Sequence, residues 1–311
     1  MNAPVLAAQA LAKPAQSSPQ QHIAAFMARA SFEAPRPTPG DIEVLRMGIA
    51  PKTPIYVSAV PTHPLVAQID AAKRLAAAGF EPVPHIAARR FASEVELDCH
   101  LDRLVNDADV TRVLVIGGDF GPPAGPFHAA IEVIESGLLH ARGLVEVGIA
   151  GYPGGHPRLG ATELDRVLAA KVEAATETGL LVHIVTQFGF SAPAIVNWIA
   201  RLRDQGIDLP VRIGLAGPTT LSGLLRYARI CGVTASAHGL ARHTGLARHL
   251  FGMVTPDTVV RTLAEQAANL GDVAPHIFSF GGLASAARWA AAAAAGRITL
   301  DRADGFTVEP P

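Results

Sequence analysis

Polar side chains able to transfer protons or hold a ligand follow the short apolar runs of this sequence at regular intervals. In chain order they are Glu33, His85, Asp119, Tyr152, His156 and Gln187. Carboxylates and imidazoles are the groups that most often act as general acids and bases in enzymes. Each has a structural alternative: Glu33 as a surface carboxylate, His85 as a hydrogen-bonded core histidine, and Asp119 as a turn cap. For Gln187 the alternative is a buried hydrogen-bond network.

The twelve histidines raise the question of a metal site. No His-x-His or His-x-x-x-His pair stands at the end of an apolar run. His238, His243 and His249 follow one another at intervals of five and six residues, which is poor spacing for one helix face. The sequence also has no glycine-rich dinucleotide motif after a strand, no Walker A motif and no Gly-x-Ser-x-Gly elbow. We therefore expect no bound metal, with a metal-dependent hydrolase using His85, His156 and Asp119 as an alternative.

The elements that must position these side chains are short β-branched runs alternating with helical stretches. The expected strands are Ala30–Glu33, Ile55–Val60, Glu81–Ile86, Arg112–Gly117, Val145–Tyr152, Leu181–Phe188, Val211–Gly217 and His276–Gly281. Several runs are apolar on both faces, which is typical of parallel strands covered by helices. Eight such units predict an α/β fold with a single (β/α)₈ TIM barrel, whose active site lies at the carboxyl ends of the strands. An open flavodoxin-like sheet is the alternative.

Apolar residues recur at helical spacing between these runs. We expect helices over residues 65–78, ended by Gly79, over 165–175, and over 193–202 with Ser191 as its N-cap. Another is expected to open at Thr219-Thr220. The alanine-rich stretch 284–295 is expected to be an outer barrel helix, with packing against a second copy in a homo-oligomer as the alternative.

Composition limits the classes of partner and compartment. A net charge of −1 and 5% aromatic residues argue against nucleic acid as a partner, because phosphate binding requires clustered basic residues. Residues 1–21 are predicted to be a disordered tail without signal-peptide character, and 22–311 one catalytic barrel domain. No stretch is apolar enough to predict a membrane span. The two cysteines form no close pair, which fits a reducing, cytoplasmic location.

An ordered set of motifs resembles the methylenetetrahydrofolate reductase family, in particular its short, barrel-only bacterial type. The matching pieces are Ser31-Phe32-Glu33, Pro84-His85, Gly118-Asp119, Ala150-Gly151-Tyr152-Pro153 with His156-Pro157, Lys171-Val172-Glu173-Ala174 and Thr186-Gln187-Phe188. They occur in the family's order and close to its spacings, from about residue 30 to about residue 290.

The resemblance implies a folate-binding oxidoreductase in which FAD carries hydride between NADH or NADPH and the folate. It implies Glu33 as the general acid that protonates the folate's bridging nitrogen, with a pKa raised by burial. It places Asp119 near the flavin and pterin as a second catalytic residue that tunes the charge there, and Gln187 and Phe188 on the substrate. It assigns FAD binding to His85, Gly118, Asp119, Tyr152, His156, Asp165 and Lys171, with Lys171 near the diphosphate.

The chain departs from the family's pattern at several positions. Gly117 stands where the family usually has arginine, Ala34-Pro35-Arg36-Pro37 replaces Phe-Phe-Pro-Pro, and Val60 replaces a hydroxyl residue. The lost arginine motivates a variant of the reaction without flavin. Oxidation of methyl-tetrahydrofolate in methyl-group catabolism and a non-catalytic folate-binding barrel are further alternatives.

Overall fold

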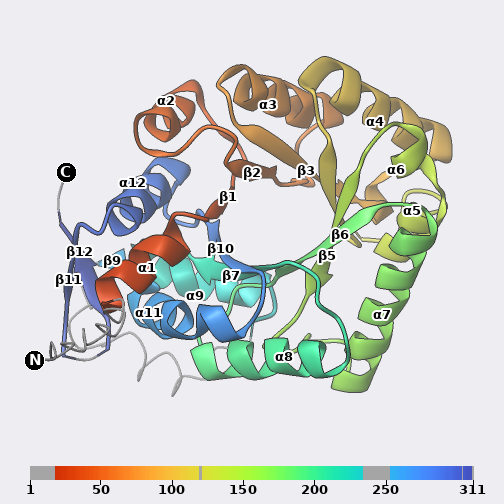
Figure 1. Cartoon of the computed structure of the whole chain (residues 1–311). Coiled ribbons are helices and arrows are strands. Elements are labelled where there is room, and N and C mark those ends of the chain that lie inside the picture. The colour runs from red at the N-terminus through yellow and green to blue at the C-terminus, as the bar shows by residue number, and fades with distance from the viewer. Residues whose placement is uncertain (1–17, 119–120, 234–252, 303, 310–311) are drawn as a thin grey trace, which may run out of the picture.

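A computed structural model describes residues 18–118, 121–233, 253–302 and 304–309. It contains a closed barrel of eight parallel strands, in the order β1-β10-β7-β6-β5-β4-β3-β2 (Figure 1). The strands are β1 (Ser31–Glu33), β2 (Pro54–Val57), β3 (Glu81–Ala87), β4 (Arg112–Ile116), β5 (Glu146–Gly151), β6 (Leu181–Thr186), β7 (Val211–Ala216) and β10 (Val273–Phe278). The predicted barrel is confirmed, and the open-sheet alternative is wrong because β1 pairs with both β2 and β10.

Helices cover the outside of the barrel (Figure 1). They are α1 (Pro19–Met27), α2 (Pro39–Gly48), α3 (Leu65–Ala77), α4 (Glu94–Ala108), α5 (Ala130–Glu135), α6 (Leu138–Ala141), α7 (Ala161–Glu177), α8 (Ala192–Asp204), α9 (Leu221–Ile230), α11 (Asp257–Gln266) and α12 (Leu283–Ala294). Short 3₁₀ turns span Ala88–Arg90 and Ala267–Asn269. The large apolar core lies between this layer and the strands. None of the described helices combines the length and hydropathy needed to cross a membrane.

Two small antiparallel pairs lie outside the barrel. Strand β8 (Thr219–Thr220) pairs with β9 (Met253–Val254), and β11 (Ile298–Leu300) pairs with β12 (Phe306–Val308). The β8–β9 pair follows β7, so it lies on the side of the barrel where the strands end.

Local signals in the sequence set several helix ends. Ser191 accepts a hydrogen bond from the Ala194 amide, and Thr220 accepts one from the Gly223 amide, so both predicted N-caps are confirmed. Gly79 follows α3 with φ of +88°, a conformation that glycine adopts without the cost a Cβ would bring.

Several element boundaries differ from the prediction, and two of them lie near the ends of the chain. Helix α1 begins at Pro19, capped by Ser18, so residues 19–21 are helical where a disordered tail was expected. The last barrel strand was predicted over His276–Gly281 but runs from Val273 to Phe278. Residues 273–275 pair with β7 alone, because β1 begins only opposite His276.

Candidate active site

A buried carboxylate, Glu33, lies at the mouth of the barrel, where β1 ends. Its oxygens are contacted by three side chains from other strands. Ser58, just after β2, donates a hydrogen bond to Oε1, and His276 of β10 bonds Oε2 through Nε2 at 3.2 Å. His85 of β3 places its Nε2 3.3 Å from the same Oε2. The residue is only 7% exposed, so four strands enclose one ionisable group.

Opposing influences act on this carboxyl group. Burial raises the pKa of Glu33, but the positive charge of His85 and the hydrogen bonds from His276 and His85 together lower it by more, so the pKa lies below its usual range. The family resemblance implies a raised pKa for Glu33 as a buried general acid. That expectation is wrong for this arrangement, because it includes burial and omits two imidazoles delivered by distant strands.

His276 is fully buried and held at both ring nitrogens. Its Nδ1 lies 2.9 Å from the Ser31 hydroxyl oxygen, and its Nε2 faces Glu33. Burial lowers the pKa of His276, although Glu33 partly opposes this. A neutral ring with its proton on Nε2 donates to Glu33 and accepts from Ser31. Ser31 and Glu33 are two residues apart on β1 and therefore point to the same face, so one short strand supplies both the carboxylate and the group that orients its partner.

Tyr56 packs against these imidazoles inside the barrel. Its ring meets His276 edge-on with centroids 4.6 Å apart, and its hydroxyl bonds His183 Nε2 at 2.8 Å. His183 Nδ1 in turn lies 2.7 Å from Glu146 Oε1, at the start of β5. A buried polar chain therefore runs down the barrel interior from the site, and it fixes the ring against which His276 packs.

Two predicted substrate residues follow β6. The side-chain oxygen of Gln187 accepts a hydrogen bond from the Phe188 amide at 3.1 Å, so part of this amide serves the local turn. Phe188 is 2% exposed and packs against Phe190, Phe278 and Phe280. The structure thus places Phe188 in an aromatic cluster beside the mouth, rather than in contact with Glu33.

A second group of predicted residues gathers after β5. The rings of Tyr152 and His156 meet edge-on at 5.0 Å, on either side of a turn in which Gly155 has φ of +83°. Tyr152 and Asp165 line a cavity of about 160 Å³, and Asp165 lies 3.9 Å from Arg201 at its rim. The structure brings these three predicted residues together.

Lys171 does not join that cavity. It lies on the inner face of α7, is 5% exposed, and its Nζ donates a hydrogen bond to the Ala150 carbonyl of β5 at 3.1 Å. Burial lowers the pKa of Lys171 to about 8. Gly118 adopts φ of +88°, and Asp119 lies outside the described residues.

Comparison with known proteins shows to which family this chain belongs. The family model for methylenetetrahydrofolate reductase matches residues 62–247, more than half of the chain. The chain belongs to the methylenetetrahydrofolate reductase family. It is also similar to methylenetetrahydrofolate reductase 2 of Saccharomyces cerevisiae, with 26% identity over 123 residues. That alignment covers 35% of this chain and 20% of the yeast protein, so the match spans one fifth of the relative's length.

Membership of the methylenetetrahydrofolate reductase family implies FAD, so the described residues should offer groups that bind its diphosphate. A diphosphate needs nearby cations or amide donors. Lys171, the expected cation, is covered by β5 and bonded to a carbonyl, while Gly117 offers no side chain where the family has arginine. The adjacent cavity of about 160 Å³ carries the carboxylate Asp165 opposite Arg201. The described part of the mouth therefore does not offer a flavin diphosphate the cations that the family resemblance implies.

The residues around Glu33 were largely missed by sequence reasoning. His276 lies 243 positions from Glu33, and Ser58 lies 25 away. The available signal was weak: a histidine or serine within an otherwise apolar strand run. Over the described residues, no group of three or more His, Cys, Asp or Glu side chains is arranged to hold a metal ion.

Proposed function

We propose that this protein is an oxidoreductase that interconverts methylene- and methyl-tetrahydrofolate with NADH or NADPH at the mouth of its barrel. One observation carries the proposal: a buried glutamate at the end of β1, held by His85, His276 and Ser58, in a barrel of the methylenetetrahydrofolate reductase family. The family match begins at residue 62, so the role of Glu33 rests on its geometry and on the motif resemblance.

Glu33 supplies the proton in this reaction. Protonation of the folate's bridging nitrogen breaks its bond to the methylene carbon and leaves an iminium, which then takes hydride to become the methyl group. The same groups run the reaction backwards when methyl-tetrahydrofolate is oxidised. Because the pKa of Glu33 is lowered, the carboxylate must first gain a proton. A pterin that covers the mouth removes water from Glu33, and this loss of water raises the pKa and favours the protonated form.

A neutral His276 keeps its Nε2 proton while it donates to Glu33, so the proton is proposed to reach Glu33 from solvent or through His85. Both place Nε2 within 3.3 Å of Glu33 Oε2. Ser31 holds the ring of His276, so the donor direction stays fixed while the proton moves. We derive no step through flavin, because the described residues do not fit its diphosphate. Hydride is instead proposed to pass directly from the nicotinamide to the folate.

The experiment that tests this function combines turnover with a visible spectrum of the purified protein. We expect folate-dependent oxidation of NADH or NADPH by protein without flavin absorption. Flavin bands that disappear on heating, with FAD in the supernatant, would contradict direct transfer but support the family reaction. Folate binding without turnover would contradict the reductase and support a non-catalytic folate-binding barrel.

The variant Glu33→Gln tests the assigned acid. Because glutamine keeps the shape but holds no transferable proton, we expect kcat to fall about 10²- to 10⁴-fold. Glu43→Gln on the exposed face of α2 is the matched control and should turn over like the wild type. Full folate turnover by Glu33→Gln would contradict the role of Glu33 as the acid.

A further inference from the structure

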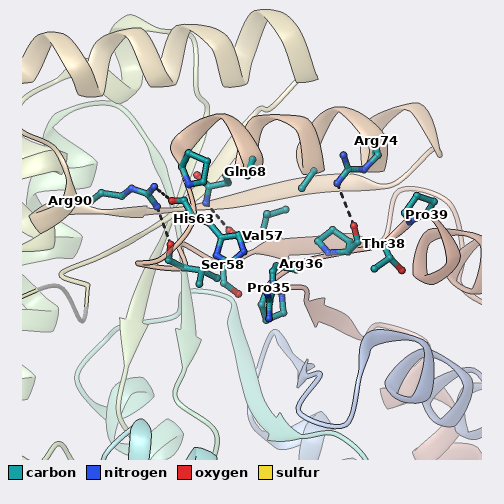
Figure 2. Close-up of a pocket in the computed structure, with 15 residues that line it drawn as sticks. Pro35, Arg36, Thr38, Pro39, Val57, Ser58, His63, Gln68, Arg74 and Arg90 are labelled. Atoms are coloured by element: carbon teal, nitrogen blue, oxygen red, sulfur yellow. Dashed lines mark hydrogen bonds between the residues drawn. The ribbon is translucent and has the colours of Figure 1, made fainter.

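A cavity of about 350 Å³ opens beside the glutamate, between the segments that follow β1 and β2 and one face of α3 (Figure 2). Ser58 lines this cavity and also donates the hydrogen bond to Glu33 Oε1. The cavity and the catalytic carboxylate therefore share one side chain. A ligand reacting at Glu33 can extend into this space.

The lining of the cavity is strongly basic. Three arginines, Arg36, Arg74 and Arg90, and one histidine, His63, contribute to it, and none of the described lining residues is acidic. The whole chain carries a net charge of −1, so this is a local concentration of positive charge. Among the described residues, neither Arg36 nor Arg74 has a carboxylate within ion-pair distance, which leaves their charge to act on a ligand.

The basic groups are held at separate places around the cavity. Arg90 donates to the carbonyls of Val60 and His63, and Arg74 lies 3.4 Å from the carbonyl of Pro37. Figure 2 shows Arg90 and Arg74 toward opposite ends, with Arg36 and Ser58 between them. This spread fits an elongated anion with more than one charged group better than a single small ion.

The surrounding backbone is rigid, which limits the entropy lost on binding. Pro35, Pro37 and Pro39 restrict the segment after β1, and each lines the cavity. Gln68 on α3 donates to the carbonyls of Val57 and His85 and so ties the cavity floor to β2 and β3. Helix α3 begins at Leu65 without a side-chain cap, so the positive end of its dipole adds to the field of the arginines.

We propose that this cavity binds the anionic portion of the ligand whose reacting end lies at Glu33, through carboxylate or phosphate oxygens held by Arg36, Arg74 and Arg90. The proposal rests on the proposed function for the identity of that ligand. Two sources carry such chemistry: the glutamate tail of a folate and the phosphates of a nicotinamide dinucleotide. Arg36 stands within the segment where the family has Phe-Phe-Pro-Pro, so this one cation of the lining departs from the family's pattern.

Kinetics separate the two sources. In Arg36→Ala and Arg74→Ala, we expect KM to rise about tenfold for one substrate while kcat stays within twofold. If the cavity binds the glutamate tail, the substitutions should raise KM for a pentaglutamate folate more than for the monoglutamate. If it binds phosphates, they should raise KM for the dinucleotide. Arg46→Ala on α2, outside the cavity lining, is the matched control and should leave both constants unchanged. Circular dichroism shows whether each exposed-arginine variant remains folded.

A binding measurement keeps this test independent of turnover. Inorganic pyrophosphate and penta-γ-glutamate are titrated calorimetrically into wild type, the double variant Arg36→Ala/Arg74→Ala and the control. At least one probe should bind the wild type, and its affinity should be tenfold or more lower for the double variant. Added salt should also weaken its binding to the wild type. This result would support the cavity even if no folate turned over. Failure of both probes to bind the wild type, or equal binding by the double variant, would overturn the proposal.

Discussion

Glu33 shows how one carboxyl group can be influenced in two directions by the same barrel. Its burial at the end of β1 favours the neutral acid, whereas His85 and His276 favour the carboxylate. Ser58 adds a further donor on the other oxygen. Removing one imidazole should therefore change the protonation of Glu33 without moving the carboxylate from the mouth.

We expect His276→Gln to shift the pH profile of the reductive reaction toward higher pH. His276 lowers the pKa of Glu33, so without it burial is less opposed and Glu33 stays protonated to higher pH. The measurement is kcat/KM as a function of pH, with exposed His140→Gln as the control. A lower rate with an unshifted profile would mean that His276 acts on packing alone.

At the scale of the elements, Lys171 couples helix α7 to strand β5 at an energetic cost. Burial lowers the pKa of Lys171 from 10.5 to about 8, so the folded protein disfavours the ammonium form. At pH below about 8 both folded and unfolded chains hold the proton, and the cost is fully present. Between pH 8 and 10.5 the unfolded chain binds more protons than the folded one, so stability rises with pH.

The variant Lys171→Met should lose this pH dependence. We expect the free energy of unfolding of the wild type to rise by about 3 kcal/mol more than that of Lys171→Met over this range. Urea unfolding at the two ends of the range measures the difference. Lys73→Met on exposed α3 is the control. Parallel pH curves for wild type and Lys171→Met would contradict the assignment.

Strand β5 also needs a glycine where it faces the imidazole of β6. A Cβ added at Gly148 would lie 2.7 Å from His183 Nε2, the atom that bonds Tyr56. We expect Gly148→Ala to lower stability by about 1–3 kcal/mol, because the fully buried ring has little room to move. Thermal unfolding measures this. Gly154→Ala, where an added Cβ meets nothing within 4 Å, should be near neutral, and equal stabilities would contradict the expected clash.

At the scale of the whole molecule, the barrel is closed by its two ends. Strand β1 pairs with β10, and Arg29, between α1 and β1, donates to the Val273 carbonyl and pairs with Asp272 at the start of β10. The proposed acid Glu33 and its partner His276 lie on this seam. Closure of the barrel and the contacts of Glu33 therefore depend on the same pairing of β1 with β10.

The segment matched by the family model should not fold alone. Residues 62–247 omit β1, β2 and β10, so β3 and β7 would become open edges and the apolar interior would be exposed. We expect this fragment to lack cooperative thermal unfolding and to bind a hydrophobic dye. A sharp unfolding transition, with the near-ultraviolet dichroism of a packed core, would contradict this.

The sequence alone predicted the architecture because strand and helix signals are local. Apolar runs such as residues 113–116, of which 113–115 are buried, indicated parallel strands between helices, and Gly79 and Ser191 marked helix ends that the structure confirms. Glu33 was assigned to the strand end that forms the mouth. The order of motifs also indicated the family before any tertiary contact was known.

Only the tertiary structure decided what surrounds these residues. His276 meets Glu33 across 243 positions, Lys171 turns toward a strand instead of a cavity, and Arg36, Arg74 and Arg90 share one basic space. Side-chain neighbours across a closed barrel depend on strand order and register, and both are set by long-range packing. The pKa of Glu33 follows from those neighbours, so its direction was beyond the reach of local sequence patterns.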